Sequence, residues 1–250
     1  MDLPKNMLIE GETTDMVNIP VWGALLQTDG HNIVYDLGCM EDCMEKYWSE
    51  SQKVRDPYYE NKEGMEGLLA KVGLKCEDID TVIVSHLHSD HFGLITKFPH
   101  ADVYVTDEEW SLAMKKAFGS IKPRETPIGP YYYRCMSAPV KEYHFIKKDE
   151  DFELFPGLEL ITLPGHVANL IGLKVTTDSG EKFLFCSDAV YTPTNITPKL
   201  TLPGVISDPE NYKASMAKVK NIAEKEGAQI LYSHYMPFFK TLKQCPEWYE

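Results

Sequence analysis

The sequence predicts a layered α+β fold, built from strands with a smaller number of helices between them. Several segments have the β-branched and aromatic content of strands, and turn residues separate most of them. Metal-binding residue types directly follow several of these strands. At 250 residues and 43% hydrophobic content, the chain is long enough to bury one sizeable core. We find neither a repeat nor a low-complexity linker, so residues 1–250 are expected to form a single domain.

The predicted strands are short and regularly punctuated. In chain order they cover Ile19 to Gln27, Asn32 to Tyr35, Thr81 to Val84, Asp102 to Val105, Leu158 to Thr162, Leu170 to Thr176, Lys182 to Phe185 and Gln229 to Tyr232. Thr28-Asp29-Gly30 forms a turn after the first of them. Asp178-Ser179-Gly180 predicts a hairpin between the two strands on either side of it.

Three helices are indicated by residues at their ends. A short helix is expected over Gly64 to Val72, and Thr106 with Glu109 forms a capping box for another that runs to about Phe118. Asp208-Pro209 opens the third, which Gly227 ends. Its expected apolar face consists of Tyr212, Met216, Val219, Ile222 and Ala223.

Residues 119–150 stand apart, because they combine several prolines with the run Tyr131-Tyr132-Tyr133 and little periodicity. Long structureless segments inside compact domains are often lids or binding loops. We expect an irregular, aromatic-rich segment that caps a site, contacts a partner subunit, or packs its own tyrosines at the surface. The sequence leaves these three possibilities open.

Charge and composition exclude several classes of partner. A formal net charge of −13 disfavours nucleic acid and anionic membrane surfaces, since both are bound through clustered Lys and Arg. No apolar run approaches the ~20 residues that span a bilayer, and the first residues lack the apolar part of a signal peptide. Six scattered cysteines without CxxC pairs indicate reduced thiols. A cytoplasmic protein is expected.

The run His86-Leu87-His88-Ser89-Asp90-His91 directly follows the predicted strand Thr81 to Val84. Alternate residues leaving a strand point the same way, so His86, His88 and Asp90 can converge while His91 turns to the other side. That spacing can serve two adjacent cations. A solvated His-rich turn is the alternative, but ligand sites of open α/β folds lie beyond the carboxyl ends of strands, where this run stands.

Three more potential ligands follow other predicted strands: His166, Asp188 and His234. Five histidines and two aspartates are too many for one tetrahedral ion, whereas two cations ~3.5–4 Å apart, bridged by one carboxylate, would use them all. Asp188 is the natural bridge because it stands alone between the histidine groups. Imidazole and carboxylate without thiolate suit zinc, iron or manganese.

This order of ligands resembles that of the metallo-β-lactamase superfamily, from Val34-Tyr35-Asp36-Leu37-Gly38 to Tyr232-Ser233-His234. The resemblance implies a four-layer αββα sandwich, with two mixed β-sheets flanked by helices, and two divalent metal ions, zinc in the first place and iron or manganese otherwise. It implies His86, His88 and His166 on one ion, Asp90, His91 and His234 on the other, and Asp188 as the bridge. A bridging hydroxide would be the nucleophile, and Asp36 would orient a ligand histidine.

Within that superfamily the chain is most similar to the N-acyl homoserine lactonase and 4-pyridoxolactonase group, through Pro20-Val21-Trp22, Asp188-Ala189-Val190-Tyr191 and Phe239-Lys240-Thr241. The likeness implies that Tyr191 contacts the substrate carbonyl oxygen and that Asp90 protonates the leaving alkoxide. The chain departs from the family at Phe92-Gly93, at Asn169 and at Tyr235. These residues and Trp22 are therefore expected to border the substrate pocket and bear on substrate identity.

The resemblance favours a metal-dependent hydrolase that opens a lactone, a quorum-quenching activity, in a monomer or homodimer that acts on a small molecule. Thioester hydrolysis of the hydroxyacylglutathione type, β-lactam hydrolysis, phosphodiester hydrolysis and one-iron sulfur dioxygenation remain alternatives. The acidic charge weakens a nuclease, and a secreted β-lactamase would normally carry a signal peptide. A non-catalytic metal-containing binding protein is the alternative from another class, but it has no evident need for seven ligands.

Overall fold

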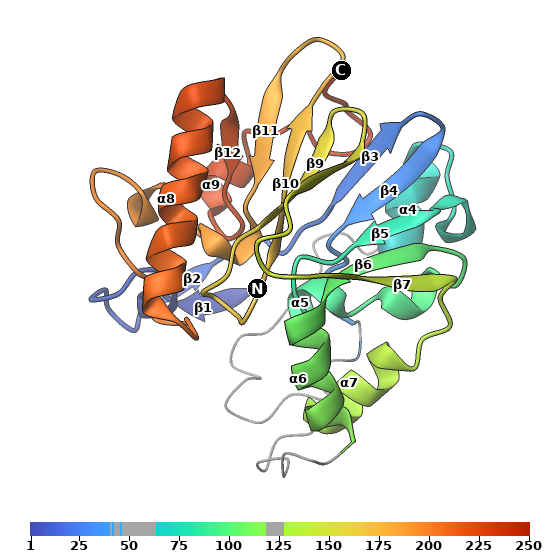
Figure 1. Cartoon of the computed structure of the whole chain (residues 1–250), viewed down its shortest axis with the longest axis horizontal. Coiled ribbons are helices and arrows are strands. Elements are labelled where there is room, and N and C mark those ends of the chain that lie inside the picture. The colour runs from blue at the N-terminus through green and yellow to red at the C-terminus, as the bar shows by residue number, and fades with distance from the viewer. Residues whose placement is uncertain (41, 43–45, 47–63, 119–127) are drawn as a thin grey trace. The chain divides into compact units, whose positions relative to one another are not determined.

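The computed structural model describes residues 1–40, 42, 46, 64–118 and 128–250. They form two compact units, which we call the first unit (Val21–Ile146, with Met1) and the second unit (Asp2–Pro20 and Lys147–Glu250). Each unit contains one five-stranded mixed sheet, and helices accompany both sheets (Figure 1). The predicted class, two mixed sheets flanked by helices, is confirmed. Within the described residues, no helix combines the length and apolar composition that crossing a bilayer requires.

The sheet of the first unit begins with a hairpin and continues with parallel strands. Its strand order is β3 (Ala24–Thr28), β4 (His31–Tyr35), β5 (Thr81–Ile83), β6 (Asp102–Thr106) and β7 (Glu142–Ile146). β3 and β4 are antiparallel, and β4 to β7 are parallel. Asp29 and Gly30 have φ values of 46° and 82°. Two left-handed residues give the tight turn whose twist matches that of a hairpin.

The described residues of this unit include four helices and two 3₁₀ turns. They are α4 (Gly64–Lys71), α5 (Ser89–Phe92), α6 (Asp107–Ala117), α7 (Ile128–Met136), η1 (Cys76–Asp78) and η2 (Ile95–Lys97). The predicted helices at 64–72 and 107–118 are therefore present. Thr106 is the N-cap of α6, but its side chain makes no capping hydrogen bond there, so the predicted capping box is wrong.

The expectation of irregular structure over residues 119–150 is wrong for two described parts, α7 and β7. Pro130 lies in the first turn of α7, where a missing N–H costs nothing, so the prolines do not prevent the helix. β7 owes its conformation to pairing with β6, in which Asp102 is opposite Glu142 and Thr106 is opposite Ile146. Tyr143, Phe145 and Ile146 are themselves residue types that favour strands. Residues 119–127 lie outside the described part of the chain.

The sheet of the second unit has the order β12 (Gln229–Leu231), β11 (Lys182–Phe185), β10 (Ile171–Thr176), β9 (Leu158–Thr162) and β8 (Phe152–Phe155). β11 and β12 are parallel, and the other neighbours are antiparallel. It follows that β9, β11 and β12 all run in one direction. The predicted hairpin between β10 and β11 is confirmed. The strands β1, β2, β7 and β8 were not predicted, and the first predicted strand begins at Ala24 instead of Ile19.

The remaining elements of the second unit are β1 (Asp2–Pro4), β2 (Met16–Asn18), α1 (Lys5–Leu8), α8 (Pro209–Glu226), α9 (Met236–Phe239), η3 (Ser187–Ala189) and η4 (Pro193–Asn195). β1 pairs with β2 in a separate ribbon. α8 begins and ends where the sequence predicts. The side chain of Asp208 accepts from the backbone N–H groups of Glu210 and Asn211, and Gly227 closes the helix in a left-handed conformation. Tyr212, Met216 and Val219 of α8 are fully buried in the core of this unit.

Candidate metal centre

Three candidate ligands of the second unit lie at one edge of its sheet. His166 follows β9, Asp188 lies in η3 after β11, and His234 follows β12. Since these three strands run in one direction, their carboxyl ends meet at the same edge. All three side chains are buried. The predicted convergence of separate strand ends is thus present within this unit.

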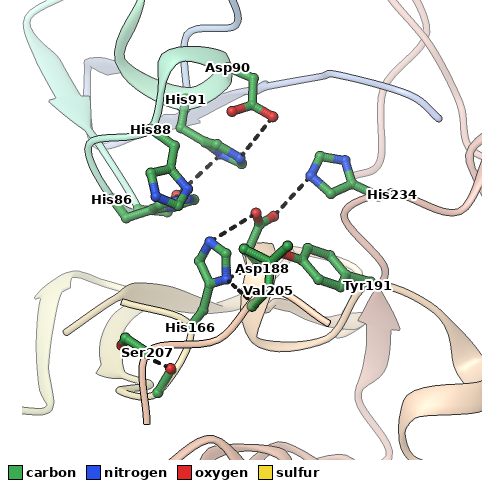
Figure 2. A network of polar contacts seen from close by, with 12 residues as sticks. His86, His88, Asp90, His91, His166, Asp188, Tyr191, Val205, Ser207 and His234 are labelled. Carbon is green, nitrogen blue, oxygen red and sulfur yellow. Dashed lines mark hydrogen bonds and ion pairs between the residues drawn. The ribbon is translucent and has the colours of Figure 1, made fainter. Parts of the chain in front are cut away.

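The carboxylate of Asp188 lies between the two imidazoles. Its Oδ2 atom is 3.3 Å from Nε2 of His166, and its Oδ1 atom is 3.1 Å from Nε2 of His234 (Figure 2). Each carboxylate oxygen therefore faces a different histidine. A carboxylate that serves one cation with each of its oxygens needs this arrangement.

Backbone carbonyls determine which nitrogen of each histidine carries the proton. Nδ1 of His166 lies 3.1 Å from the carbonyl oxygen of Val205, and Nδ1 of His234 lies 3.0 Å from that of Pro20. A carbonyl only accepts, so both Nδ1 atoms are donors and, in neutral rings, the Nε2 lone pairs face Asp188. On each side of the Asp188 carboxylate, an oxygen then faces a nitrogen lone pair, and both of these atoms are hydrogen-bond acceptors. Positive charge has to compensate, either as protons on the imidazoles or as cations, and the donor set fits divalent cations.

The first unit builds its ligand set on the carboxyl ends of two parallel strands. Asp36 directly follows β4, and the segment from Ser85 to His91 follows β5. Asp36 has a φ of 56°, which is unusual for a residue with a side chain. In this conformation its Oδ1 accepts from the backbone N–H of Ser85 at 2.8 Å, and its Oδ2 accepts from the Ser85 hydroxyl at 2.9 Å.

Asp36 also sets the orientation of two histidines. Its Oδ2 atom lies 2.7 Å from Nδ1 of His91, and the Ser85 hydroxyl, which donates to Asp36, lies 3.0 Å from Nδ1 of His86. Both Nδ1 atoms are therefore donors, so in neutral rings each Nε2 atom carries the lone pair that could bind a metal. Ser85 was not singled out from the sequence, although a polar residue that closes a buried strand just before His86 was a usable signal.

The other two candidate ligands of the first unit, His88 and Asp90, lie beside the rings of His86 and His91. Nε2 of His86 lies 2.9 Å from Nδ1 of His88, and Nε2 of His91 lies 3.7 Å from Oδ2 of Asp90 (Figure 2). Two ring nitrogens at hydrogen-bond distance, and a ring nitrogen beside a carboxylate, are both arrangements that a cation could occupy. The spacing H-x-H-x-D-H thus brings its four polar side chains together within the first unit.

Tyr191 lies beside both histidines of the second unit. Its hydroxyl is 3.2 Å from Nδ1 of His166, and its ring stacks on that of His234 with centroids 5.2 Å apart. Since Nδ1 of His166 is a donor, its single N–H is shared between the Val205 carbonyl and the Tyr191 oxygen, and both oxygens accept from it. The hydroxyl proton can then be donated to a further oxygen.

The four expected pocket residues are divided between the units. Phe92 at the end of α5 and Asn169 before β10 are both completely buried. Trp22 and Tyr235 are partly exposed, and Tyr235 is the N-cap of α9. The backbone carbonyl oxygens of Pro20 and Val205 orient two candidate ligand histidines. They could not be found from the sequence, because every residue type has a backbone carbonyl.

Comparison with known proteins shows both a family and a group of relatives. The model of the metallo-beta-lactamase superfamily matches residues 19–234. The N-acyl homoserine lactonase AiiB of Agrobacterium fabrum is 29% identical over 241 residues, which cover 94% of this chain and 87% of that protein. The N-acyl homoserine lactonase AiiA of Bacillus thuringiensis subsp. kurstaki is 27% identical over 239 residues, covering 93% of this chain and 88% of its own length.

A solved structure is similar over almost the whole chain. It is an N-acyl homoserine lactone hydrolase with the product N-hexanoyl-L-homoserine bound at its catalytic metal centre. The TM-score is 0.82 at 26% sequence identity, and the match covers 98% of this chain and 94% of that one.

Proposed function

Because the chain belongs to the metallo-β-lactamase superfamily, we propose that it is a metal-dependent hydrolase that opens the ring of a lactone. The observation that carries this proposal is the carboxylate of Asp188, whose two oxygens each face the Nε2 atom of a different histidine. The substrate class rests on the lactonases to which the chain is similar over 94% of its length. An N-acyl homoserine lactone is the first substrate to test, and quorum quenching would be the biological consequence.

We propose that the chain binds two divalent cations. His86, His88 and His166 would hold one of them, and Asp90, His91 and His234 the other. This ligand division follows the family, with Asp188 bridging. Five imidazoles and two carboxylates without a thiolate favour zinc, and iron or manganese are the alternatives.

When bound, the two cations would lower the pKa of a water towards neutrality and polarise the carbonyl of the substrate. The residues of the chain would orient the ligands and transfer the proton that the reaction needs. Asp36 keeps the Nε2 atoms of His86 and His91 available, because it fixes both Nδ1 atoms as donors. Asp90 would then carry a proton to the leaving alkoxide as the ring opens.

Tyr191 is proposed to donate its hydroxyl proton to the carbonyl oxygen of the substrate as negative charge develops there. The hydrogen bond that its oxygen accepts from His166 holds the phenol in place and directs its own proton elsewhere. Its ring, stacked on His234, fixes the phenol from the other side.

Several finer features remain proposals from the sequence. They are a single domain over residues 1–250, a cytoplasmic location, a monomer or homodimer, a capping or interface role for the segment 119–150, and substrate contacts by Trp22, Phe92, Asn169 and Tyr235. α7, with its buried Tyr131 and Tyr132, gives that segment a folded core.

The decisive experiment assays one metal-loaded preparation against lactones, β-lactams, thioesters and phosphodiesters, with its metal content measured on the same sample. We expect about two divalent cations per chain and turnover of N-acyl homoserine lactones, both lost in Asp188→Ala. The matched control is Asp178→Ala, at an exposed turn between β10 and β11. Hydrolysis of thioesters alone would overturn the lactone assignment, and full activity in Asp188→Ala would overturn the metal mechanism.

A further inference from the structure

Helix α8 and the turn before it hold the segment that carries His166 by its backbone carbonyls. The Ser215 hydroxyl donates to the carbonyl oxygen of Pro164 at 2.7 Å, and the N–H groups of Ser207 and Asp208 both donate to that of Gly165 at 2.9 Å. At the end of β9, two residues before Pro164, the carbonyl oxygen of Thr162 accepts from the Lys218 ammonium group at 3.0 Å. The chain just before His166 is therefore bonded to α8 and to the turn that leads into it.

Tyr212 connects the same helix to the segment that carries Asp188. Its hydroxyl donates to the carbonyl oxygen of Asp188 at 2.8 Å, and its side chain is completely buried. Its backbone meanwhile packs against Gly165, so closely that a Cβ atom there would lie 2.2 Å from the Tyr212 nitrogen. One residue thus contacts both the neighbour of His166 and the backbone of Asp188.

The backbone at Asp188 needs such support. Asp188 lies in the 3₁₀ turn η3, and the preceding Ser187 has a φ of 43°, in the left-handed region that disfavours residues with a Cβ atom. A strained conformation persists only where its surroundings hold it. The hydrogen bond from Tyr212 holds this turn at the residue whose side chain faces His166.

Packing alone does not account for the hydroxyl of Tyr212. Met216 and Val219 lie on the same helix face and fill the same buried cluster with apolar atoms only. A buried hydroxyl costs free energy unless it is hydrogen-bonded, so a phenylalanine would serve the packing equally well. The phenol is explained by its bond to Asp188.

We infer that Tyr212 is a positioning residue, which sets the separation between the carboxylate of Asp188 and the imidazole of His166 and thereby the affinity for metal. This inference rests on the proposed function for its chemistry. It concerns the backbone that carries the ligands, and Tyr212 itself contacts neither substrate nor cation.

The test compares Tyr212→Phe with Tyr143→Phe. Tyr143, in β7 of the first unit, has a buried hydroxyl without a hydrogen-bond partner among the described residues and serves as the matched control. Cation affinity is measured by competition with a chelator, ligand geometry by the visible absorption of Co²⁺-loaded protein, and folding by thermal unfolding of the metal-free protein. We expect Tyr212→Phe to fold, to bind its weaker cation about 10-fold less tightly and to shift the Co²⁺ bands, while Tyr143→Phe matches the wild type.

A second variant keeps the inference falsifiable if Tyr212→Phe unfolds. Ser215→Ala removes a buried hydrogen bond between α8 and the His166 loop but leaves the bond to Asp188 intact. We expect Ser215→Ala to weaken cation binding by about threefold, which is less than the loss in Tyr212→Phe, and to alter the Co²⁺ bands. Unchanged affinity and unchanged Co²⁺ bands in a folded Tyr212→Phe would overturn the positioning role. If only Ser215→Ala folds, the same result in that variant would overturn it, because α8 would then not set the separation of the two ligand segments.

The outcome for the proposed function is read separately, from the wild-type protein. If the wild type binds cations without hydrolysing lactones, the substrate assignment fails, and the affinities of the variants still decide the role of Tyr212. If the wild type hydrolyses lactones and Tyr212→Phe keeps its affinity and spectrum, only the inference about Tyr212 fails. A wild type that binds no divalent cation overturns both.

Discussion

Oδ2 of Asp36 lies 2.7 Å from Nδ1 of His91, and both side chains are almost completely buried. The same oxygen accepts from the Ser85 hydroxyl, which in turn lies beside Nδ1 of His86. One carboxylate therefore determines the tautomer of two candidate ligands. An aspartate–histidine pair at the surface would not fix a tautomer in this way, because water would compete for the hydrogen bonds of both side chains.

Replacement of Asp36 by asparagine should weaken metal binding. The amide nitrogen cannot accept, so the side chain can no longer satisfy Ser85 and His91 together. Partners of this kind typically contribute 10–100-fold to metal affinity, and we expect a loss of about that size for one cation, measured by chelator competition. Asp80→Asn is the control, because Asp80 pairs with His31 at a similar 2.9 Å, with both side chains about 40% exposed. Equal losses in the two variants would contradict the assigned role.

Removal of the Tyr191 hydroxyl should separate catalysis from metal binding. In Tyr191→Phe the Nδ1 atom of His166 keeps the Val205 carbonyl as its acceptor, so metal content should persist. Loss of one donor to a developing oxyanion typically lowers kcat about 100-fold or more, and we expect that decrease with a smaller change in KM. Tyr232→Phe, whose ring packs on Phe238 with centroids 5.2 Å apart, should retain wild-type kinetics. Unchanged turnover in Tyr191→Phe would remove its catalytic role.

The candidate ligands could be found in the sequence because they follow strands with a strong local pattern. His166, Asp188 and His234 each come after a segment of apolar, β-branched or aromatic residues. The common direction of β9, β11 and β12 then brings the three ends to one edge of the sheet. α8 was equally accessible, since its cap, its first-turn proline and its closing glycine are local signals.

What the sequence did not reveal are features that depend on partners distant along the chain. β7 pairs with β6, and although Tyr143, Phe145 and Ile146 are common in strands, the prolines and low periodicity of the surrounding segment hid that signal. The carbonyl oxygens that orient His166 and His234 belong to Val205 and Pro20, and a backbone atom has no signature in the sequence. Tyr212 was predicted only as part of an apolar face, because its hydroxyl finds its acceptor in another loop.

The contact between Gly165 and α8 should not tolerate a side chain. Gly165 has a φ of +130°, and a Cβ atom would lie 2.2 Å from the backbone nitrogen of Tyr212. Gly165→Ala should therefore lower the free energy of unfolding by about 3 kcal/mol or more, measured by urea denaturation. In the control Gly180→Ala, with a φ of +86° and no atom within 4 Å, only the left-handed conformation should cost about 1–2 kcal/mol. If the two variants lose equal stability, the close approach to α8 is not what requires the glycine.

The N-cap of α8 should make stability depend on pH in the acidic range. Backbone and side-chain hydrogen bonds from Asn211 hold the pKa of Asp208 below its ordinary value. A carboxyl group with a lowered pKa in the folded state contributes stability above its unfolded pKa of about 3.9, and this contribution is lost as the pH falls through the folded value. At pH 7, Asp208→Ala should therefore melt about 2–4 °C below the wild type.

The difference between the two proteins should begin to shrink as the pH falls below about 4, because the unfolded chain then takes up a proton at Asp208 while the folded protein does not. The loss is complete once the carboxyl group is protonated in the folded protein as well. Other acidic groups titrate in both proteins and cancel in the comparison. Asp208→Asn, which keeps an acceptor for the N–H groups of Glu210 and Asn211 without a titratable proton, should recover most of the lost stability at pH 7. Thermal melting of the three proteins between pH 3 and 7, a range chosen to span the pKa of about 3.9, measures this. A gap between wild type and Asp208→Ala that stays constant across that range would show that the charge of Asp208 contributes nothing to the cap.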